Sequence, residues 1–217
     1  MRIVAGVDGC PQGWVAAVWG PDGVEWRVTP LAFGALLDAL GDAEVVAADV
    51  PIGLPDPAPR ECDLLARAAL GSGRSSVFVV PPREVLEAPD YAAACAVARS
   101  LTGKAISLQT WHIGARVLDA TDTVAARPER RVVEAHPEVS FATLAGGPLP
   151  SKLGAAGIGV RIAALAPVFG DVPALLAACP RPARADDALD ALACAWTARR
   201  ELDGTAAYLG DGPSIAY

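Results

Sequence analysis

The chain has 217 residues, of which 53% are hydrophobic and 20% are charged, and its formal net charge at pH 7 is −7. This composition excludes a disordered chain, and the acidity argues against a broad nucleic-acid-binding surface while leaving room for a local one. The five cysteines share no short spacing, which argues against a disulfide framework or a zinc knuckle.

Targeting signals are not evident in the sequence. The N-terminal stretch "MRIVAGVDG" is too short for a signal peptide, and no apolar run reaches the roughly 18 residues that a membrane span needs. We therefore predict a cytoplasmic protein without a membrane partner. Its length suits one domain over residues 1–217, and a homodimer is the commonest default assembly for such a protein.

The first fifty residues predict a β-β-β-α-β arrangement. Apolar runs predict strands at Arg2–Asp8, Trp14–Trp19 and Val24–Val28, with a hairpin turn at Gly20–Gly23 between the last two. Residues 31–41 have apolar side chains at helical spacing and end on a glycine, and Val45–Val50 is a further apolar strand. The expected fold is a three-stranded antiparallel meander, a crossover helix and a strand that returns beside the first.

The middle of the chain departs from this regular pattern. A Pro-rich loop after Pro51 is followed by helical periodicity at residues 61–71, 90–103 and 108–126, which predicts a mainly helical insertion at about 51–130. A short strand is then expected at Val132–Ala135. Helices are expected at Ala156–Leu165, Val172–Ala178 and 185–204.

Five carboxylates fall at strand ends or at a helix start. Asp8 ends the first strand, Asp49 lies near the end of the returning strand, Glu134 lies on the later strand, and Asp187 and Asp190 share one face of the last helix. Capping explains any one of them alone. An ionised carboxylate is unfavourable in an apolar environment unless a positive group meets it, so the set as a whole indicates a cation site.

Carboxylate oxygens are the ligands that Mg²⁺ and Mn²⁺ prefer. Two such ions about 4 Å apart hold the attacking and leaving oxygens of a phosphodiester in many nucleases. The predicted site therefore binds two ions, with Asp8 between them and the other four carboxylates around them. The predicted reaction is hydrolysis without a covalent enzyme intermediate.

Motifs along the whole chain carry a resemblance. The segments "VDGCPQGW", "ADVPIGLP", "VEAHPEVSF" and "DDALDALACAWTA" resemble a bacterial domain-of-unknown-function family, number four-two-nine, whose members are described as predicted ribonuclease-H-like nucleases. The helix pattern D-x-x-D-A-x-A is similar to that of Holliday-junction resolvases.

This resemblance implies an α/β, ribonuclease-H-like fold with a mixed five-stranded sheet flanked by helices. It implies metal-dependent phosphodiester hydrolysis and a nucleic-acid partner of unknown form. It also implies Asp8, Asp49, Glu134 and Asp187 as metal ligands, with Asp190 as a fifth candidate.

Four cations are candidates for contact with an anionic substrate. Arginine binds phosphate through two donors and lysine acts as a point charge. The candidates are Arg60, Arg83, Lys104 and Lys152.

Two alternatives stay open. The same sheet topology occurs in phosphotransferases of the actin and sugar-kinase type, and "VDGCPQGW" would then bind phosphate. Against this alternative, 217 residues provide only one copy of a domain that such kinases carry twice, and no Walker motif is present. The other alternative is a non-catalytic protein on this fold that binds nucleic acid or a small anion.

Overall fold

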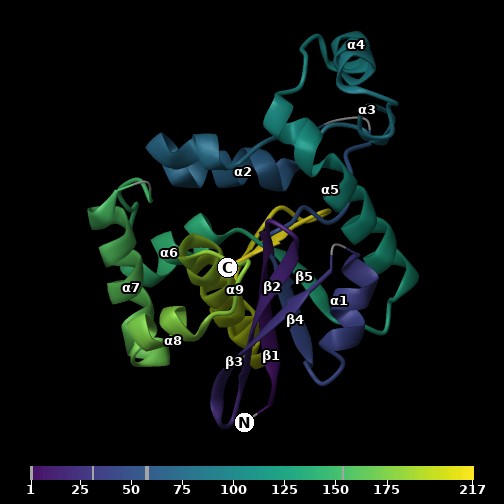
Figure 1. Ribbon diagram of the computed structural model, residues 1–217. Coiled ribbons are helices and arrows are strands. Elements are labelled where there is room, and N and C mark those ends of the chain that lie inside the picture. The colour runs from purple at the N-terminus through teal and green to yellow at the C-terminus, as the bar shows by residue number, and fades with distance from the viewer. Residues whose placement is uncertain (1, 31, 57–58, 153) are drawn as a thin grey trace.

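One mixed seven-stranded sheet forms the centre of the computed structural model, which describes residues 2–30, 32–56, 59–152 and 154–217 (Figure 1). The strands lie in the order β3-β2-β1-β4-β5-β7-β6. β1, β2 and β3 are antiparallel neighbours, β4, β5 and β7 run parallel to β1, and β6 is antiparallel to β7. Their bounds are β1 Val4–Cys10, β2 Gly13–Gly20, β3 Gly23–Thr29, β4 Val45–Ala48, β5 Val132–Ala135, β6 Tyr208–Leu209 and β7 Ile215–Ala216.

The α/β class and the β-β-β-α-β start are confirmed, but the predicted number of strands, five, is wrong. The two additional strands, β6 and β7, pair at one edge of the sheet, beyond β5. Each has two residues, which is too short for an alternating pattern to be recognised in the sequence.

Helices cover both faces of the sheet. They are α1 Phe33–Ala39, α2 Glu61–Leu70, α3 Arg83–Leu86, α4 Tyr91–Thr102, α5 Leu108–Ala126, α6 Pro137–Ala145, α7 Ala155–Phe169, α8 Val172–Ala178 and α9 Ala185–Asp203, with a short 3₁₀ helix at Gly71–Ser76. The helix predicted at 31–41 begins at Phe33, and Leu31 lies outside the described residues. The sequence missed α3 and α6.

Alternation along β1 assigns its side chains to the two faces. Ala5 and Val7 join the core cluster that contains residues of α1 and α5, whereas Val4 joins the cluster formed with α9. Because side chains of a strand alternate between faces, Asp8 lies on the same face as Val4, toward α9.

A glycine allows α9 to approach this face closely. A Cβ atom on Gly6 would lie 1.9 Å from the backbone nitrogen of Ala195 and 2.2 Å from the carbonyl oxygen of Ala191. Alanines on α9 therefore pack directly against the backbone of β1, which brings the first turns of the helix to the end of the strand.

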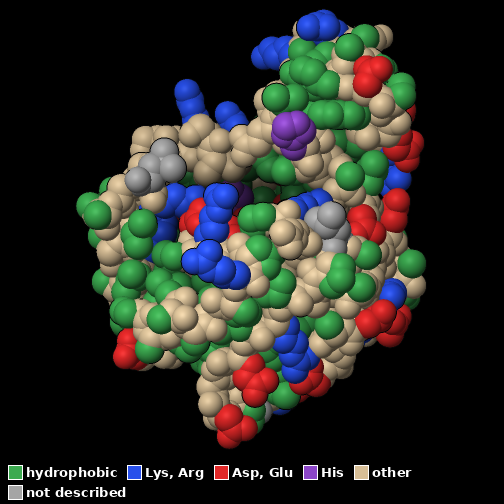
Figure 2. Space-filling view, in the orientation of Figure 1, with side chains coloured by type: hydrophobic (Ala, Val, Ile, Leu, Met, Phe, Trp, Pro, Cys, Tyr) green, Lys and Arg blue, Asp and Glu red, His purple; other side chains and the backbone are tan. Residues whose placement is uncertain are grey.

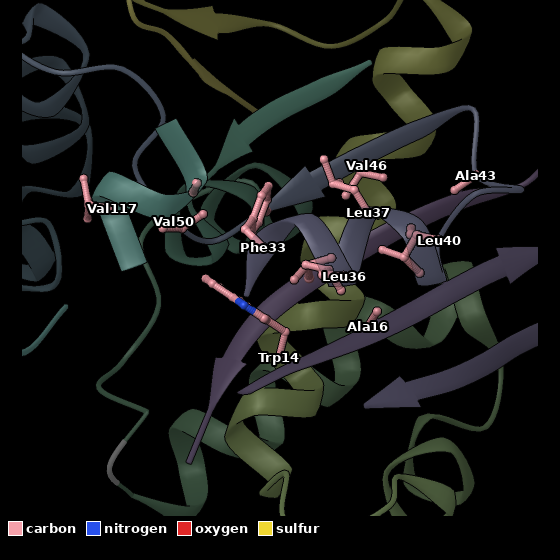
Figure 3. Close-up of a cluster of buried hydrophobic side chains, with 14 of the residues drawn as sticks. Trp14, Ala16, Phe33, Leu36, Leu37, Leu40, Ala43, Val46, Val50 and Val117 are labelled. Carbon is pink, nitrogen blue, oxygen red and sulfur yellow. The ribbon is translucent and has the colours of Figure 1, made fainter. Parts of the chain in front are cut away.

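The opposite face buries the larger hydrophobic cluster (Figure 3). Trp14 and Phe33 stack edge to face with ring centroids 5.3 Å apart, and Val117 of α5 packs with them. The last helix of the predicted insertion is thus part of the main core. Figure 1 shows α2 and α4 of that segment above the upper end of the sheet.

Within the described ranges, no single helix is long and apolar enough to cross a membrane. A cytoplasmic location and a homodimer stay predictions.

Candidate metal and phosphate site

A pocket of about 360 Å³ lies where β1, β4 and β5 end. Its lining combines strand ends with the start of α6, the second turn of α9 and the loop before α7. Figure 2 shows a hollow below α2 in which basic side chains border acidic ones. The charged and polar lining residues that matter below are Asp8, Asp49, Glu134, Glu138, Lys152, Asp190 and Arg116.

Asp8 lies at the pocket because it is near the end of β1 on the face toward α9. Its Oδ1 accepts a hydrogen bond from the backbone N–H of Gly9 at 2.7 Å. Burial, followed by repulsion from Asp49, Asp190 and Asp187, raises the pKa of Asp8 well above its ordinary value. The carboxylate of Asp8 is therefore held among like charges.

Asp49 follows β4 directly and continues its pairing with β1. Its backbone N–H donates to the carbonyl oxygen of Val7 at 2.8 Å, which places the Asp49 side chain beside that of Asp8. Burial raises the pKa of Asp49 to about 7, with Lys152 lowering it and Glu138 raising it.

Asp190 projects from the second turn of α9 and is only 4% exposed. Its Oδ2 accepts a hydrogen bond from Nζ of Lys152 at 2.7 Å, but within the described part of the chain its Oδ1 has no hydrogen-bond partner. Burial raises the pKa of Asp190 to about 7, partly offset by Lys152 and reinforced by Asp49. A buried, unpartnered carboxylate oxygen is unfavourable, so this atom is suited to a ligand.

Lys152 is the substrate-binding candidate that the fold does bring to the site. A Cβ atom on Gly157 would lie 1.9 Å from the carbonyl oxygen of Ser151, so this glycine lets the loop before α7 fold tightly against the helix. Burial opposes the Lys152 charge, but Asp190, Asp49 and Asp8 together raise the pKa of its ammonium group.

Glu138 was not identified from the sequence. It lies in the first turn of α6, directly after Pro137, where an acidic residue is typical of any helix start and carries no functional signal of its own. Its two oxygens accept hydrogen bonds from Arg161, Nε at 3.2 Å and Nη2 at 2.5 Å. Its charge raises the pKa values of Asp49 and Asp190, so it belongs to the same electrostatic cluster.

Glu134 lines the pocket but has a different electrostatic environment. Its Oε1 accepts from Nη2 of Arg60 at 2.6 Å and its Oε2 accepts from the backbone N–H of Ile52 at 2.7 Å. Burial raises the pKa of Glu134 to about 7, against the lowering effect of Arg60. The structure thus separates this carboxylate from Asp8 and Asp49.

The strand register explains the separation. Val7 pairs with Ala48 across β1 and β4, and Ala48 pairs with Glu134 across β4 and β5. Residues in register point to the same face of the sheet, so the Glu134 side chain lies on the same face as that of Val7. Asp8 is the next residue after Val7 and therefore points to the opposite face.

Arg60 lies in the interior, behind the pocket carboxylate Glu134. It is 3% exposed and lies between two carboxylates, donating to Glu134 and to Oδ1 of Asp63 at 2.8 Å from Nη2. Its observed contacts are those of an interior residue that neutralises buried charge.

Asp187 lies near the pocket without lining it. Its Oδ2 accepts a hydrogen bond from the backbone N–H of Arg184 at 2.8 Å, which is a capping interaction at the start of α9. Its charge still raises the pKa of Asp8.

Two predicted substrate residues lie away from the pocket. Arg83 is in α3 and pairs with Asp122 at 2.5 Å and Glu87 at 3.1 Å on the surface. Lys104 lines a second pocket, of about 400 Å³, among proline side chains beside α4.

Arg116 of α5 is a pocket cation that was not chosen as a candidate from the sequence. Its Nη2 donates to the carbonyl oxygen of Cys10 at 2.9 Å, and its guanidinium lies 5.3 Å from the ring centroid of Trp14. A Cβ atom on Gly9 would lie 2.4 Å from Nη1, so the glycine makes room for this arginine beside Asp8.

The donors fit a hard divalent cation in chemistry: Asp8, Asp49 and Asp190 offer carboxylate oxygens, and one of these is buried and unpartnered. Among residues 2–30, 32–56, 59–152 and 154–217, no three Asp, Glu, His or Cys side chains are already gathered into a ligand set. A cation would therefore have to draw these mutually repelling carboxylates together.

Comparison with known proteins gives a family and no named relative. A family model described as "Protein of unknown function (DUF429)" matches residues 6–214, nearly the whole chain. No curated protein and no solved structure matches the chain significantly.

Proposed function

The chain belongs to the DUF429 family, whose description assigns no activity, and we propose from its site that it is a divalent-metal-dependent phosphodiester hydrolase acting on nucleic acid. One observation carries this proposal. Asp8, Asp49 and Asp190 come from three separate elements to one pocket, where their charges repel and one buried oxygen of Asp190 has no partner among the described residues.

The order of the elements supports the same reading. An antiparallel meander followed by parallel strands, with acidic residues where β1 and β4 end and on the closing helix, is the arrangement we expect of a ribonuclease-H-like nuclease. The proposed fold family is therefore ribonuclease-H-like, extended by β6 and β7.

In this proposal Asp8, Asp49 and Asp190 would hold Mg²⁺ or Mn²⁺, which when bound would supply a nucleophilic water and neutralise phosphate charge. Lys152 and Arg116 both line the pocket, and they would bind the anionic phosphodiester and fix its position. In hydrolysis the water oxygen forms a bond to phosphorus while the bond to the leaving oxygen breaks. The proton that the water gives up is balanced by one that the leaving oxygen takes up.

The test is cleavage of a substrate panel by wild type and by Asp8→Asn in Mn²⁺ or Mg²⁺. The panel contains single strands, duplexes, an RNA–DNA hybrid and a four-way junction. Asp186→Asn is a matched control, because Asp186 is an exposed acid near the start of α9 that does not line the pocket.

Metal-dependent cleavage by wild type and the control, but not by Asp8→Asn, is the expected result. Equal cleavage by wild type and Asp8→Asn contradicts the proposal. Binding of a substrate or of Mn²⁺ with no cleavage of any panel member replaces it with the non-catalytic binding function.

A further inference from the structure

The pocket contains the positive charge of Lys152 next to its aspartates. Nζ of Lys152 lies 2.7 Å from Oδ2 of Asp190, and its charge acts on Asp49 and Asp8 as well. An ammonium group is a compact point charge, so it neutralises carboxylates and phosphate oxygens much as a cation does.

The Lys152 loop is held in place by a buried residue. Arg161, 2% exposed, donates from Nη1 to the carbonyl oxygens of Pro150 at 3.0 Å and Gly157 at 2.7 Å, and it also grips Glu138. The lysine backbone is therefore anchored next to the carboxylates, whereas its side chain is still 41% exposed and accessible from solvent.

The oxygens that remain for a metal are few. Both carboxylate oxygens of Glu134 accept hydrogen bonds, from Arg60 and from the N–H of Ile52. Both oxygens of Glu138 accept from Arg161, and one oxygen of Asp187 accepts from the N–H of Arg184 at the start of α9. Of the three aspartates that line the pocket, Asp8 accepts a hydrogen bond from the N–H of Gly9 with one oxygen, and Asp190 accepts one from Lys152 with one oxygen. Among the described pocket-lining carboxylates, those with an oxygen outside these contacts are therefore Asp8, Asp49 and Asp190.

The charges point in the same direction. Asp8, Asp49 and Asp190 carry three negative charges when ionised, and Lys152 offsets one of them, because Glu138 has its own partner in Arg161. Lys152 thus supplies part of the positive charge that these carboxylates need, and a divalent cation would supply more.

We infer that the site binds one divalent cation, through Asp8, Asp49 and Oδ1 of Asp190, and that the ammonium group of Lys152 takes the place of a second ion. This inference rests on the proposed function and specifies its cofactor. It replaces the expected pair of ions by one ion and a lysine.

The test is Mn²⁺ titration of the purified protein by calorimetry, together with electron paramagnetic resonance of bound Mn²⁺. Wild type should bind one ion per chain and give the resolved hyperfine spectrum of an isolated Mn²⁺. Two ions per chain with a spin-coupled spectrum, or no bound Mn²⁺, would overturn the inference.

Lys152→Met removes the charge and keeps the length of the side chain. Mn²⁺ affinity should rise by at least about tenfold, because the ion no longer competes with an ammonium group near the same carboxylates. Lys152→Arg is the matched control and should keep one ion at near wild-type affinity. An unchanged affinity in Lys152→Met, once its folding is verified by circular dichroism, contradicts the inference.

The cleavage panel is measured on the same samples and separates the two proposals. Binding of one isolated Mn²⁺ ion without cleavage of any substrate supports the inference and contradicts the proposed hydrolase activity. Substrate cleavage together with two spin-coupled Mn²⁺ ions per chain supports the proposed hydrolase activity and contradicts the inference.

Discussion

Arg161 binds both carboxylate oxygens of Glu138, with Nε at 3.2 Å and Nη2 at 2.5 Å, although the arginine is almost completely buried. The same guanidinium also supports the backbone on either side of the Lys152 loop, at Pro150 and Gly157. One buried side chain therefore connects α6, α7 and the loop that supplies the pocket lysine.

Replacing Arg161 by Met should lower the free energy of unfolding by about 3–5 kcal/mol, because Glu138 would be left without its partner. Urea denaturation followed by circular dichroism measures the loss. The double variant Arg161→Met/Glu138→Gln should recover part of it, since no unpaired charge remains. If the double variant is as unstable as the single one, the arginine acts through its packing and its bonds to the carbonyl oxygens of Pro150 and Gly157, and the pair with Glu138 contributes little.

Gly6→Ala should destabilise the protein by roughly 2–4 kcal/mol, because the new Cβ atom would overlap sterically with backbone atoms of α9. Gly20→Ala is the matched control, since its Cβ would meet a side-chain carbon of Ile3 at 3.5 Å, an ordinary contact. Thermal melting of both variants distinguishes them. Equal melting temperatures would show that α9 can move away from β1 without penalty.

Asp49→Asn and Glu134→Gln should have opposite effects. The first removes a proposed ligand and should weaken Mn²⁺ binding by at least about tenfold, with no loss of stability in the metal-free protein. The second replaces a carboxylate whose two oxygens already accept from Arg60 and from the N–H of Ile52, and it should leave Mn²⁺ binding intact. Calorimetric titration and urea denaturation provide the two readouts. Loss of Mn²⁺ binding in Glu134→Gln would restore that residue to the ligand set.

The metal-free protein should lose stability as the pH rises. The pKa values of Asp49, Asp190 and Glu134 are about 7 in the folded state, above an unfolded value of about 4. A raised folded-state pKa gives stability that is complete below about pH 4 and is lost as the pH rises through about 7.

Asp49→Asn removes one of these groups and tests that sign. In the presence of a chelator, the variant should gain stability over wild type by on the order of 1–3 kcal/mol between pH 5 and pH 8. Urea denaturation at the two pH values measures this difference. A difference that shrinks with rising pH has the wrong sign for this explanation.

Arg116→Gln should raise the KM for a phosphodiester substrate, since the pocket would lose the guanidinium that lies beside Asp8. The expected increase is roughly tenfold for a charge-assisted contact. Arg83→Gln, which changes a surface arginine in α3, should leave KM unchanged. Similar effects of both substitutions would indicate a general loss of positive charge.

Local patterns in the sequence determined the class of fold and the positions of all three proposed ligands of the candidate site. Apolar runs ending in a carboxylate placed Asp8 and Asp49 at strand ends, and helical spacing placed Asp190 on the last helix. These features are predictable because each depends on residues close together in the chain.

Tertiary structure decided the rest of the site. Glu134 faces away from the gathered aspartates because the register of β5 on β4 aligns it with Ala48 instead of Asp49, and register depends on pairing between distant segments. Lys152 was one of four candidate cations, and only the close fit of its loop against Gly157 and Arg161 brings it to Asp190. Glu138 and Arg116 resemble an ordinary helix-start acid and an ordinary surface arginine until packing places them at the ends of β1 and β4, because side-chain environment is a property of the assembled fold.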